Sequence, residues 1–302
     1  MKYFLNDLLK FSAFFIISTL VLSVGTTVLA KNIISFEIPD DKTSLIVGDS
    51  RPESAINDDI LSNAFNFSQS GTAYFYSYLK IRAMLENNPH IDTLVLGYAY
   101  DDISKSRDEW FNGAEMIKFK MPKYLLLFNY RDFISLFQSN PYEVSKNIHR
   151  TVIYNSSALL KYIITGQGID HLGGFQYLER DKLQEAKNRY SPGKDGENLE
   201  YSKYQEEYLL KIYNLARSKN IDLILLNTPI HALKQETEEK YKDYYYSFAE
   251  HQLPETVIVN HTNMDIPEYG FGDLEHLNYK GAQIYSEYLK EHGFLSSPNG
   301  KP

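Results

Sequence analysis

Short apolar runs alternate with amphipathic stretches along the chain, and this alternation predicts the fold. The runs are four to six residues long and rich in Val, Ile and Leu, as expected of strands buried on both faces of a parallel sheet. Five strands are predicted, at residues 44–47, 64–67, 93–97, 221–226 and 255–259. Helices between them predict an α/β fold with three layers (α/β/α), a five-stranded parallel sheet and right-handed crossovers.

Apolar residues recur at helical spacing between these strands. A short helix is predicted at residues 52–61 and a longer one at 74–87, which Pro89 ends. Residues 104–219 are too many for one crossover, and their helical segments (123–137, 141–164 and 200–218) predict a mostly helical insertion. Such insertions often form lids or substrate walls, although a purely structural role stays open.

The N-terminal segment predicts a membrane anchor. Residues 11–30 are almost uncharged and long enough to span a bilayer as a helix. Basic residues precede this run and acidic residues follow it: Lys2 and Lys10, then Glu37, Asp40 and Asp41. The positive-inside rule therefore predicts a single-pass protein whose domain lies outside the cytoplasm. Residues 28–30 also resemble a signal-peptidase site, so cleavage is the competing outcome.

The predicted organisation is an anchor or uncleaved signal at 1–30, a linker at 31–42, one domain at 43–294 and a tail at 295–302. The tail is rich in Ser, Pro and Gly, which predicts disorder. The chain of 302 residues is long enough to bury a full core.

Composition excludes several classes of function. The net charge of -8 argues against binding to nucleic acid. The chain has no cysteine, which excludes disulfides and thiolate metal sites. No His/Asp/Glu cluster has metal-ligand spacing and no glycine-rich phosphate loop occurs, so neither a metal nor a cofactor is predicted. The 25 tyrosines suit contact with carbohydrate or protein, and amphipathic packing explains them equally well.

A serine lies where the first predicted strand meets the first helix. The sequence Gly48-Asp49-Ser50 follows the strand, Pro52 suits a first helical turn, and Glu53 has capping-box spacing from Ser50. Ligands of open α/β sheets bind at this edge, near helix N–H groups that favour negative charge. Ser50 is therefore either a plain N-cap or a nucleophile.

A histidine far downstream favours the nucleophile. His276 follows the last predicted strand, and Asp273 lies three residues before it. In a loop that enters a helix, Asp273 can accept a hydrogen bond from Nδ1 of His276 while Nε2 faces Ser50. The loops after the first and last strands open on the same sheet edge, so the fold predicts a Ser-His-Asp triad.

These blocks resemble those of the SGNH (GDSL-like) hydrolase superfamily. Gly48-Asp49-Ser50 matches its first block, Gly71 the glycine of its second, and Asp273 with His276 its final Asp-x-x-His block. The resemblance covers residues 43–103 and 220–292 and implies that backbone N–H groups of Ser50 and Gly71 stabilise an oxyanion. The layout is similar to the membrane-attached branch that includes alginate O-acetyltransferases and the D-alanyl transfer protein of teichoic acid. That branch implies a multi-spanning membrane O-acyltransferase as partner.

The third block departs from the family pattern. The family has Gly-x-Asn-Asp, whose asparagine donates to the oxyanion, whereas Gly97 is followed here by Tyr-Ala-Tyr-Asp-Asp. Tyr100 is the predicted replacement, because a phenol donates at neutral pH and an ionised Asp101 or Asp102 cannot.

Other polar residues near the same edge are candidates for substrate binding. Arg51 could bind an anionic sugar, or it could form a surface ion pair. His231 could contact substrate, or it could be a solvated loop residue. The acidic run at 236–240 is predicted to be a solvated helix face.

Two functions follow from this pattern. The first is an exported serine esterase or O-acyltransferase that acts on acyl esters of a cell-envelope polysaccharide. The alternative is a catalytically inactive SGNH-fold protein that binds glycan or serves in assembly.

Overall fold

The computed structural model describes residues 2–33, 35–166, 172–191 and 199–295. It forms two compact units: Met1–Ser35 with Ile117–His171, and Phe36–Met116 with Leu172–Pro302. The second unit holds the sheet and every predicted site residue. The predicted disordered tail lies almost wholly outside the described residues.

A five-stranded sheet forms the centre of the second unit. Its strands are β1 (Ser44–Val47), β2 (Ala64–Asn66), β3 (Thr93–Gly97), β4 (Asp222–Asn227) and β5 (Val257–Asn260). They pair in the order β2-β1-β3-β4-β5, and every pair is parallel. The predicted α/β fold with an all-parallel, five-stranded sheet is confirmed.

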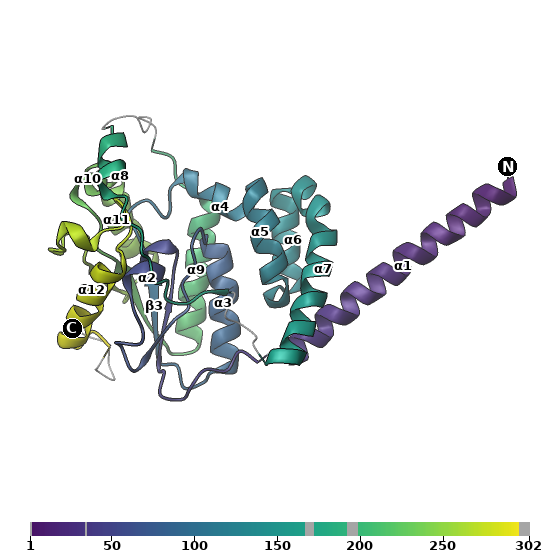
Figure 1. Ribbon diagram of the computed structural model, residues 1–302, viewed down its shortest axis with the longest axis horizontal. Coiled ribbons are helices and arrows are strands. Elements are labelled where there is room, and N and C mark those ends of the chain that lie inside the picture. Colours follow the sequence, from purple (N-terminus) through teal and green to yellow (C-terminus); the bar gives the residue numbers. More distant parts are fainter. Residues whose placement is uncertain (1, 34, 167–171, 192–198, 296–302) are drawn as a thin grey trace. The chain divides into compact units, whose positions relative to one another are not determined.

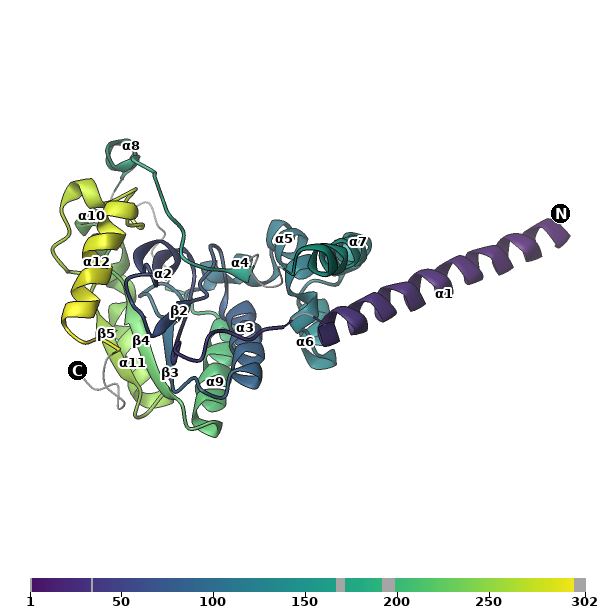
Figure 2. The same ribbon diagram turned by 60° about the horizontal axis from the view of Figure 1, so that its bottom comes forward.

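Helices cover both faces of this sheet (Figures 1 and 2). Helices α2 (Ser50–Ala55) and α12 (Tyr279–Glu291) contact each other on one face, and α3 (Tyr74–Asn87) and α9 (Lys203–Ser218) pack together on the other. The row Ile46, Val95 and Ile224 is in register across three strands and belongs to the same buried cluster as Tyr285 of α12. Because strand side chains alternate, the intervening residues point to the α3 and α9 face.

Helix α2 ends earlier than predicted. The predicted helix extends to residue 61, whereas Ile56 is already extended and its N–H donates to the carbonyl of Pro52. The side-chain amide of Asn66, at the end of β2, donates to the carbonyls of Pro52 (3.0 Å) and Ile56 (2.8 Å). The side chain of Asn66 thus satisfies the carbonyl of Ile56, which a longer helix would have paired with a backbone N–H.

The remaining helices of the second unit include α4 (Asp108–Asn112), α8 (Leu183–Arg189), α10 (Ala232–Glu238) and α11 (Lys242–Gln252). The sequence between β3 and β4 also contains α5 (Ala114–Tyr124), α6 (Tyr130–Ser139) and α7 (Pro141–Thr165), which belong wholly or mostly to the first unit. Residues 123–137 are mostly helical, as predicted, with a break at Phe128 and Asn129, where a capping box between Asn129 and Asp132 starts α6.

The apolar N-terminal segment lies within helix α1 (Lys2–Ile33). In the first unit, α1 packs against α7 and Lys31 donates to the carbonyl of Phe128. Within the ranges that the structure describes, no helix combines the length and the apolar character needed to cross a membrane.

Candidate active site

The turn after β1 positions the predicted nucleophile. Asp49, not Ser50, is the N-cap of α2, and its Oδ1 accepts the backbone N–H of Arg51 at 3.0 Å. The predicted capping role of Ser50 is therefore wrong, and so is the predicted capping box, because the backbone N–H of Glu53 donates to the carbonyl of Asp49. Since Asp49 performs the capping, the Ser50 hydroxyl is left for another partner.

Glycine is required at the tightest point of this turn. A Cβ on Gly48 would lie 2.4 Å from Cγ of Pro52 and 3.2 Å from Cα of Gly97. The carboxyl ends of β1 and β3 therefore approach each other where neither carries a side chain. This close approach places the start of α2 directly over the sheet edge.

The loop before α12 holds the predicted base. Oδ1 of Asp273 accepts the backbone N–H groups of Glu275 and His276, both at 2.9 Å. Asn278 then caps α12 by accepting the N–H groups of Lys280 and Gly281. The four residues from 273 to 276 thus form a closed turn that orients the imidazole ring.

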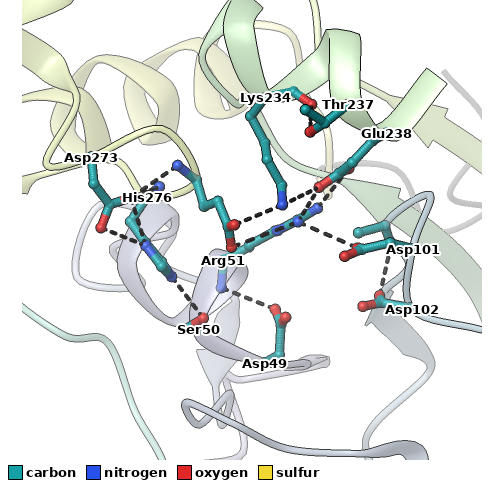
Figure 3. A network of polar contacts seen from close by, with 12 residues as sticks. Asp49, Ser50, Arg51, Asp101, Asp102, Lys234, Thr237, Glu238, Asp273 and His276 are labelled. Atoms are coloured by element: carbon teal, nitrogen blue, oxygen red, sulfur yellow. Dashed lines mark hydrogen bonds and ion pairs between the residues drawn. The ribbon is translucent and has the colours of Figure 1, made fainter. Parts of the chain in front are cut away.

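Ser50, His276 and Asp273 form a continuous chain of hydrogen bonds (Figure 3). Nε2 of His276 lies 2.8 Å from the Ser50 hydroxyl oxygen, and Nδ1 lies 2.8 Å from Oδ1 of Asp273. With the proton on Nδ1, the ring donates to Asp273 and accepts from Ser50. The structure brings Ser50 to Asp273 and His276, from which the sequence separates it by more than two hundred positions.

A residue that the sequence did not indicate also contacts the triad. Arg180 forms an ion pair with Oδ2 of Asp273. Burial raises the pKa of Asp273, but the hydrogen bond and charge of His276, the N–H of Glu275 and the guanidinium of Arg180 outweigh it, so the pKa lies below its usual value. Asp273 therefore stays ionised at neutral pH. Arg180 had no sequence signal, because it lies within the long insertion.

Arg180 belongs to an extended strap, residues 172–182, that is bonded to both sides of the triad. The N–H of Gln176 donates to the carbonyl of Glu53 in α2 at 2.8 Å. The N–H of Lys182 donates to the carbonyl of Gly272 at 2.9 Å. These backbone bonds fix the strap, and so Arg180, relative to both halves of the site.

Gly71 lies in the turn after β2, with φ of 60°. The same segment is tied to the nucleophile turn, because the N–H of Gln69 donates to the carbonyl of Gly48 at 3.0 Å and Ser70 bonds to Glu53. The left-handed conformation suits glycine. The part of Gly71 in an oxyanion hole stays a prediction.

Tyr100 and His231 have other partners in the structure. The Tyr100 hydroxyl accepts a hydrogen bond from Nδ2 of Asn260 at 2.7 Å, and Asn260 ends β5, three strands away from β1. The structure does not bring this hydroxyl to the triad. Nδ1 of His231 caps α10 by accepting the N–H of Leu233 at 3.2 Å, and its ring packs edge-on against Phe271.

Arg51 is buried rather than directed toward a substrate. Its guanidinium forms a two-point ion pair with Glu238 (2.5 and 3.2 Å) and lies 3.4 Å from Asp101. Glu238 is 1% exposed, so the prediction of a solvated helix face at 236–240 is wrong for this residue. Burial lowers the pKa of Arg51, but the surrounding carboxylates raise it well above its usual value.

The two aspartates that follow Tyr100, Asp101 and Asp102, also have partners in the structure. Asp101 pairs with Arg107 (2.8 Å) as well as Arg51, and these cations hold its pKa below the usual value although burial raises it. Asp102 accepts the N–H of Ala99 at 2.7 Å. Burial raises the pKa of Asp102 to about 7, aided by Asp101 and Asp49 and opposed by Arg107.

A small pocket lies behind the nucleophile turn, lined by Asp49, Asp102, Arg107 and Trp110 among others. Its volume of about 10 Å³ suits a single water molecule rather than an acyl chain. Within the described part of the chain, no group of three or more His, Asp or Glu side chains could hold a metal ion.

The raised pKa of Asp102 predicts a pH dependence of stability. An unfolded aspartate titrates near pH ~3.9, so folding takes up a proton between about pH 4 and about pH 7. The stabilisation from the neutral carboxyl is complete below about pH 4 and is lost as pH rises through about 7. Relative to Asp102→Asn, the parent's free energy of unfolding should fall by up to about 1.4 kcal/mol per pH unit in this window. Urea unfolding across the window measures both curves, and parallel curves would contradict the burial-driven shift.

Comparison with known proteins adds little to this geometry. A protein-family model without assigned specificity matches residues 167–293, less than half of the chain. No curated protein matches the chain. A solved structure from Streptococcus pneumonia, described as a putative platelet activating factor, is 13% identical, with a TM-score of 0.40. The alignment covers 95% of this chain and 98% of that one, and the similarity is too low to assign an activity.

Proposed function

We propose that the chain is an SGNH-type serine enzyme that cleaves or transfers acyl esters. The observation that carries this proposal is the hydrogen-bond chain from Ser50 through His276 to Asp273, with 2.8 Å contacts on both sides of the imidazole. An ordinary structural histidine needs no serine on one nitrogen and an ionised carboxylate on the other. This arrangement is the one that activates a hydroxyl as a nucleophile.

In this mechanism Nε2 of His276 takes the Ser50 proton as Oγ attacks the acyl carbonyl. Asp273 holds the ring in the tautomer with Nδ1–H and stabilises the imidazolium that forms. His276 then gives the proton to the leaving oxygen as the bond between that oxygen and the acyl carbon breaks. The acyl group remains bound to Ser50. Water or a second hydroxyl, activated by the same histidine, takes the acyl group from the serine. Hydrolysis and transfer share this intermediate.

Backbone N–H groups of Ser50 and Gly71 are the proposed oxyanion donors. An ionised Asp101 or Asp102 that faced the site would repel the oxyanion. Their partners oppose this repulsion, because Asp101 pairs with two arginines and Asp102 accepts the N–H of Ala99. The proposal therefore rests on backbone donors rather than on Tyr100.

The proposed substrate is an acyl ester of a cell-envelope polysaccharide, outside the cytoplasm. The proposed partner is a multi-spanning membrane O-acyltransferase. The location is supported by the basic residues before the N-terminal apolar run and the acidic residues after it. Helix α1 also exposes large apolar side chains over much of its length, including Phe4, Leu8, Phe14 and Ile17. Such a surface suits attachment to a membrane.

A membrane-impermeant fluorophosphonate tests nucleophile and location together. The purified full chain should be labelled at Ser50, and intact cells that carry the chain should give the same labelled peptide. Labelling of purified protein but not of intact cells would reject the location and keep the enzyme. A folded chain that resists the probe and p-nitrophenyl acetate would favour the non-catalytic glycan-binding alternative.

A further inference from the structure

Four charged residues link the two halves of the site and are here called the charged clamp: Arg51, Glu238, Lys234 and Glu275. Figure 3 labels the first three of them. Arg51 immediately follows the nucleophile Ser50, and Glu275 immediately precedes the base His276. Glu238 and Lys234 lie one turn apart on α10 and join these ends. The clamp thus runs from the nucleophile turn, through α10, to the loop that carries the base.

The contacts along this path are short. Arg51 pairs with Glu238 at 2.5 Å, Glu238 with Lys234 at 3.4 Å, and Lys234 with Glu275 at 2.7 Å. Arg51 also lies 3.9 Å from Glu275 directly. The side chains of Arg51 and Glu238 are each only 2% exposed, so water screens their attraction weakly.

Two further contacts bind α10 to the base loop. The backbone N–H of His231, at the N-cap of α10, donates to the carbonyl of Leu274 at 3.0 Å, and its ring packs on Phe271. Helix α10 is therefore fastened to the loop at its N-terminus and to the nucleophile turn near its C-terminus. These bonds make α10 a second brace between the nucleophile turn and the loop that carries the base, in addition to the strap at residues 172–182 and the contact of α2 with α12.

We propose that the charged clamp positions the base relative to the nucleophile, so that its four members are positioning residues. This inference rests on the proposed function of Ser50 and His276. The bond between Nε2 and the Ser50 hydroxyl joins two loops 226 residues apart in sequence. A misplacement of about 1 Å between reacting groups can cost roughly a hundred-fold in rate, so such a bond requires a rigid support.

The shape of the guanidinium group explains why an arginine suits this position in the clamp. Arg51 presents a planar fork that matches the two oxygens of Glu238, which fixes direction as well as distance. A buried ion pair is weak evidence for stability, because two apolar residues of similar volume often stabilise as well. Its position directly beside Ser50 therefore favours a role in geometry.

The first test replaces the buried pair with apolar residues, in the variant Arg51→Met with Glu238→Leu. This change keeps the volume approximately and leaves no charge at either position, and Asp101 keeps its closer partner Arg107, so the chain is expected to fold. We expect fluorophosphonate to label Ser50 about ten- to hundred-fold more slowly. With p-nitrophenyl acetate as substrate, the variant should lose activity through a lower kcat, with KM little changed. Amide hydrogen exchange of residues 274–278 should become faster than in the parent.

Lys234→Met is the second variant, because it cuts the clamp at a partly exposed member and keeps the Arg51–Glu238 pair. Its matched control is Lys211→Met, which removes the exposed pair with Glu207 on α9, on the other side of the sheet. Faster exchange of the base loop in Lys234→Met, but not in Lys211→Met, supports the clamp. Equal exchange and equal labelling in the two lysine variants would overturn it.

Amide exchange also separates this inference from the proposed function. If the parent does not react with fluorophosphonate, the enzyme proposal fails, and exchange of residues 274–278 still decides whether the clamp holds the loop. If the parent reacts and both clamp variants match it in rate and in exchange, the enzyme proposal stands and the clamp is rejected.

Discussion

Replacing Ser50 with alanine is expected to lower kcat for p-nitrophenyl acetate by on the order of 10⁶-fold, to the level of the oxyanion hole and binding alone. The substitution removes the atom that the geometry presents to the acyl carbonyl, while Asp49 keeps α2 capped. The melting temperature should therefore stay within a few degrees of the parent. Stopped assays measure kcat, intact mass shows whether an acyl group is bound to the chain, and thermal unfolding gives the melting temperature.

His276→Ala should cost as much as Ser50→Ala, and the double variant should cost no more than either. The three residues act as one unit, so their effects do not add. Ser218→Ala and His251→Ala are matched controls at exposed helix positions in the same unit and should keep full activity. A Ser50→Ala variant that turns over at the parent's rate would remove the nucleophile assignment.

Sequence patterns located the sheet because its strands are buried on both faces. Uninterrupted apolar runs define β1 and β3 with the predicted bounds, and the predicted helix at 74–87 coincides with α3. The end of α2 was not predicted because the side chain of Asn66, at the end of β2, binds the carbonyls of its last turn. Local propensity contains no information about such a partner.

The triad geometry followed from short-range spacing and topology, which sequence does contain. Asp273 and His276 belong to one turn, and parallel strands bring the turns after β1 and β5 to one edge. The Arg51–Glu238 pair was misread because its members lie 187 residues apart, and an acidic residue on a helix is solvated in most proteins. In the structure, Glu238 lies at the end of α10 and is buried against Arg51 of the nucleophile turn.

The prediction of Tyr100 as an oxyanion donor rested on its residue type and its place after β3, and the structure gives its side chain other neighbours. The sequence positions it after β3, at the edge where a donor is needed, but the direction of its side chain depends on α11 and β5. Its ring packs on Tyr245 of α11, and its hydroxyl meets Asn260. Both contacts lie on the β5 side of the sheet, so the phenol extends away from Ser50.

Asp273→Asn is expected to lower kcat by about 10⁴-fold while the chain stays folded. Both carboxylate oxygens of Asp273 lie within 3.0 Å of Nδ1 of His276, and Oδ1 also accepts the N–H groups of Glu275 and His276. An asparagine has one acceptor oxygen. If that oxygen keeps the two backbone bonds, the amide NH₂ faces Nδ1, which must then accept. The proton moves to Nε2, and the ring can no longer take a proton from Ser50.

Arg180 provides the control that isolates this tautomer effect. Asp273→Asn also removes the ion pair with Arg180, whereas Arg180→Gln removes that pair and leaves the carboxylate on His276. Arg180 is partly exposed, so its pair is screened and its loss should cost at most about ten-fold. A deficit in Asp273→Asn that is about a thousand-fold larger than in Arg180→Gln assigns the effect to His276. Equal deficits in the two variants would mean that Asp273 acts through the strap, and the carboxylate would lose its place in the triad.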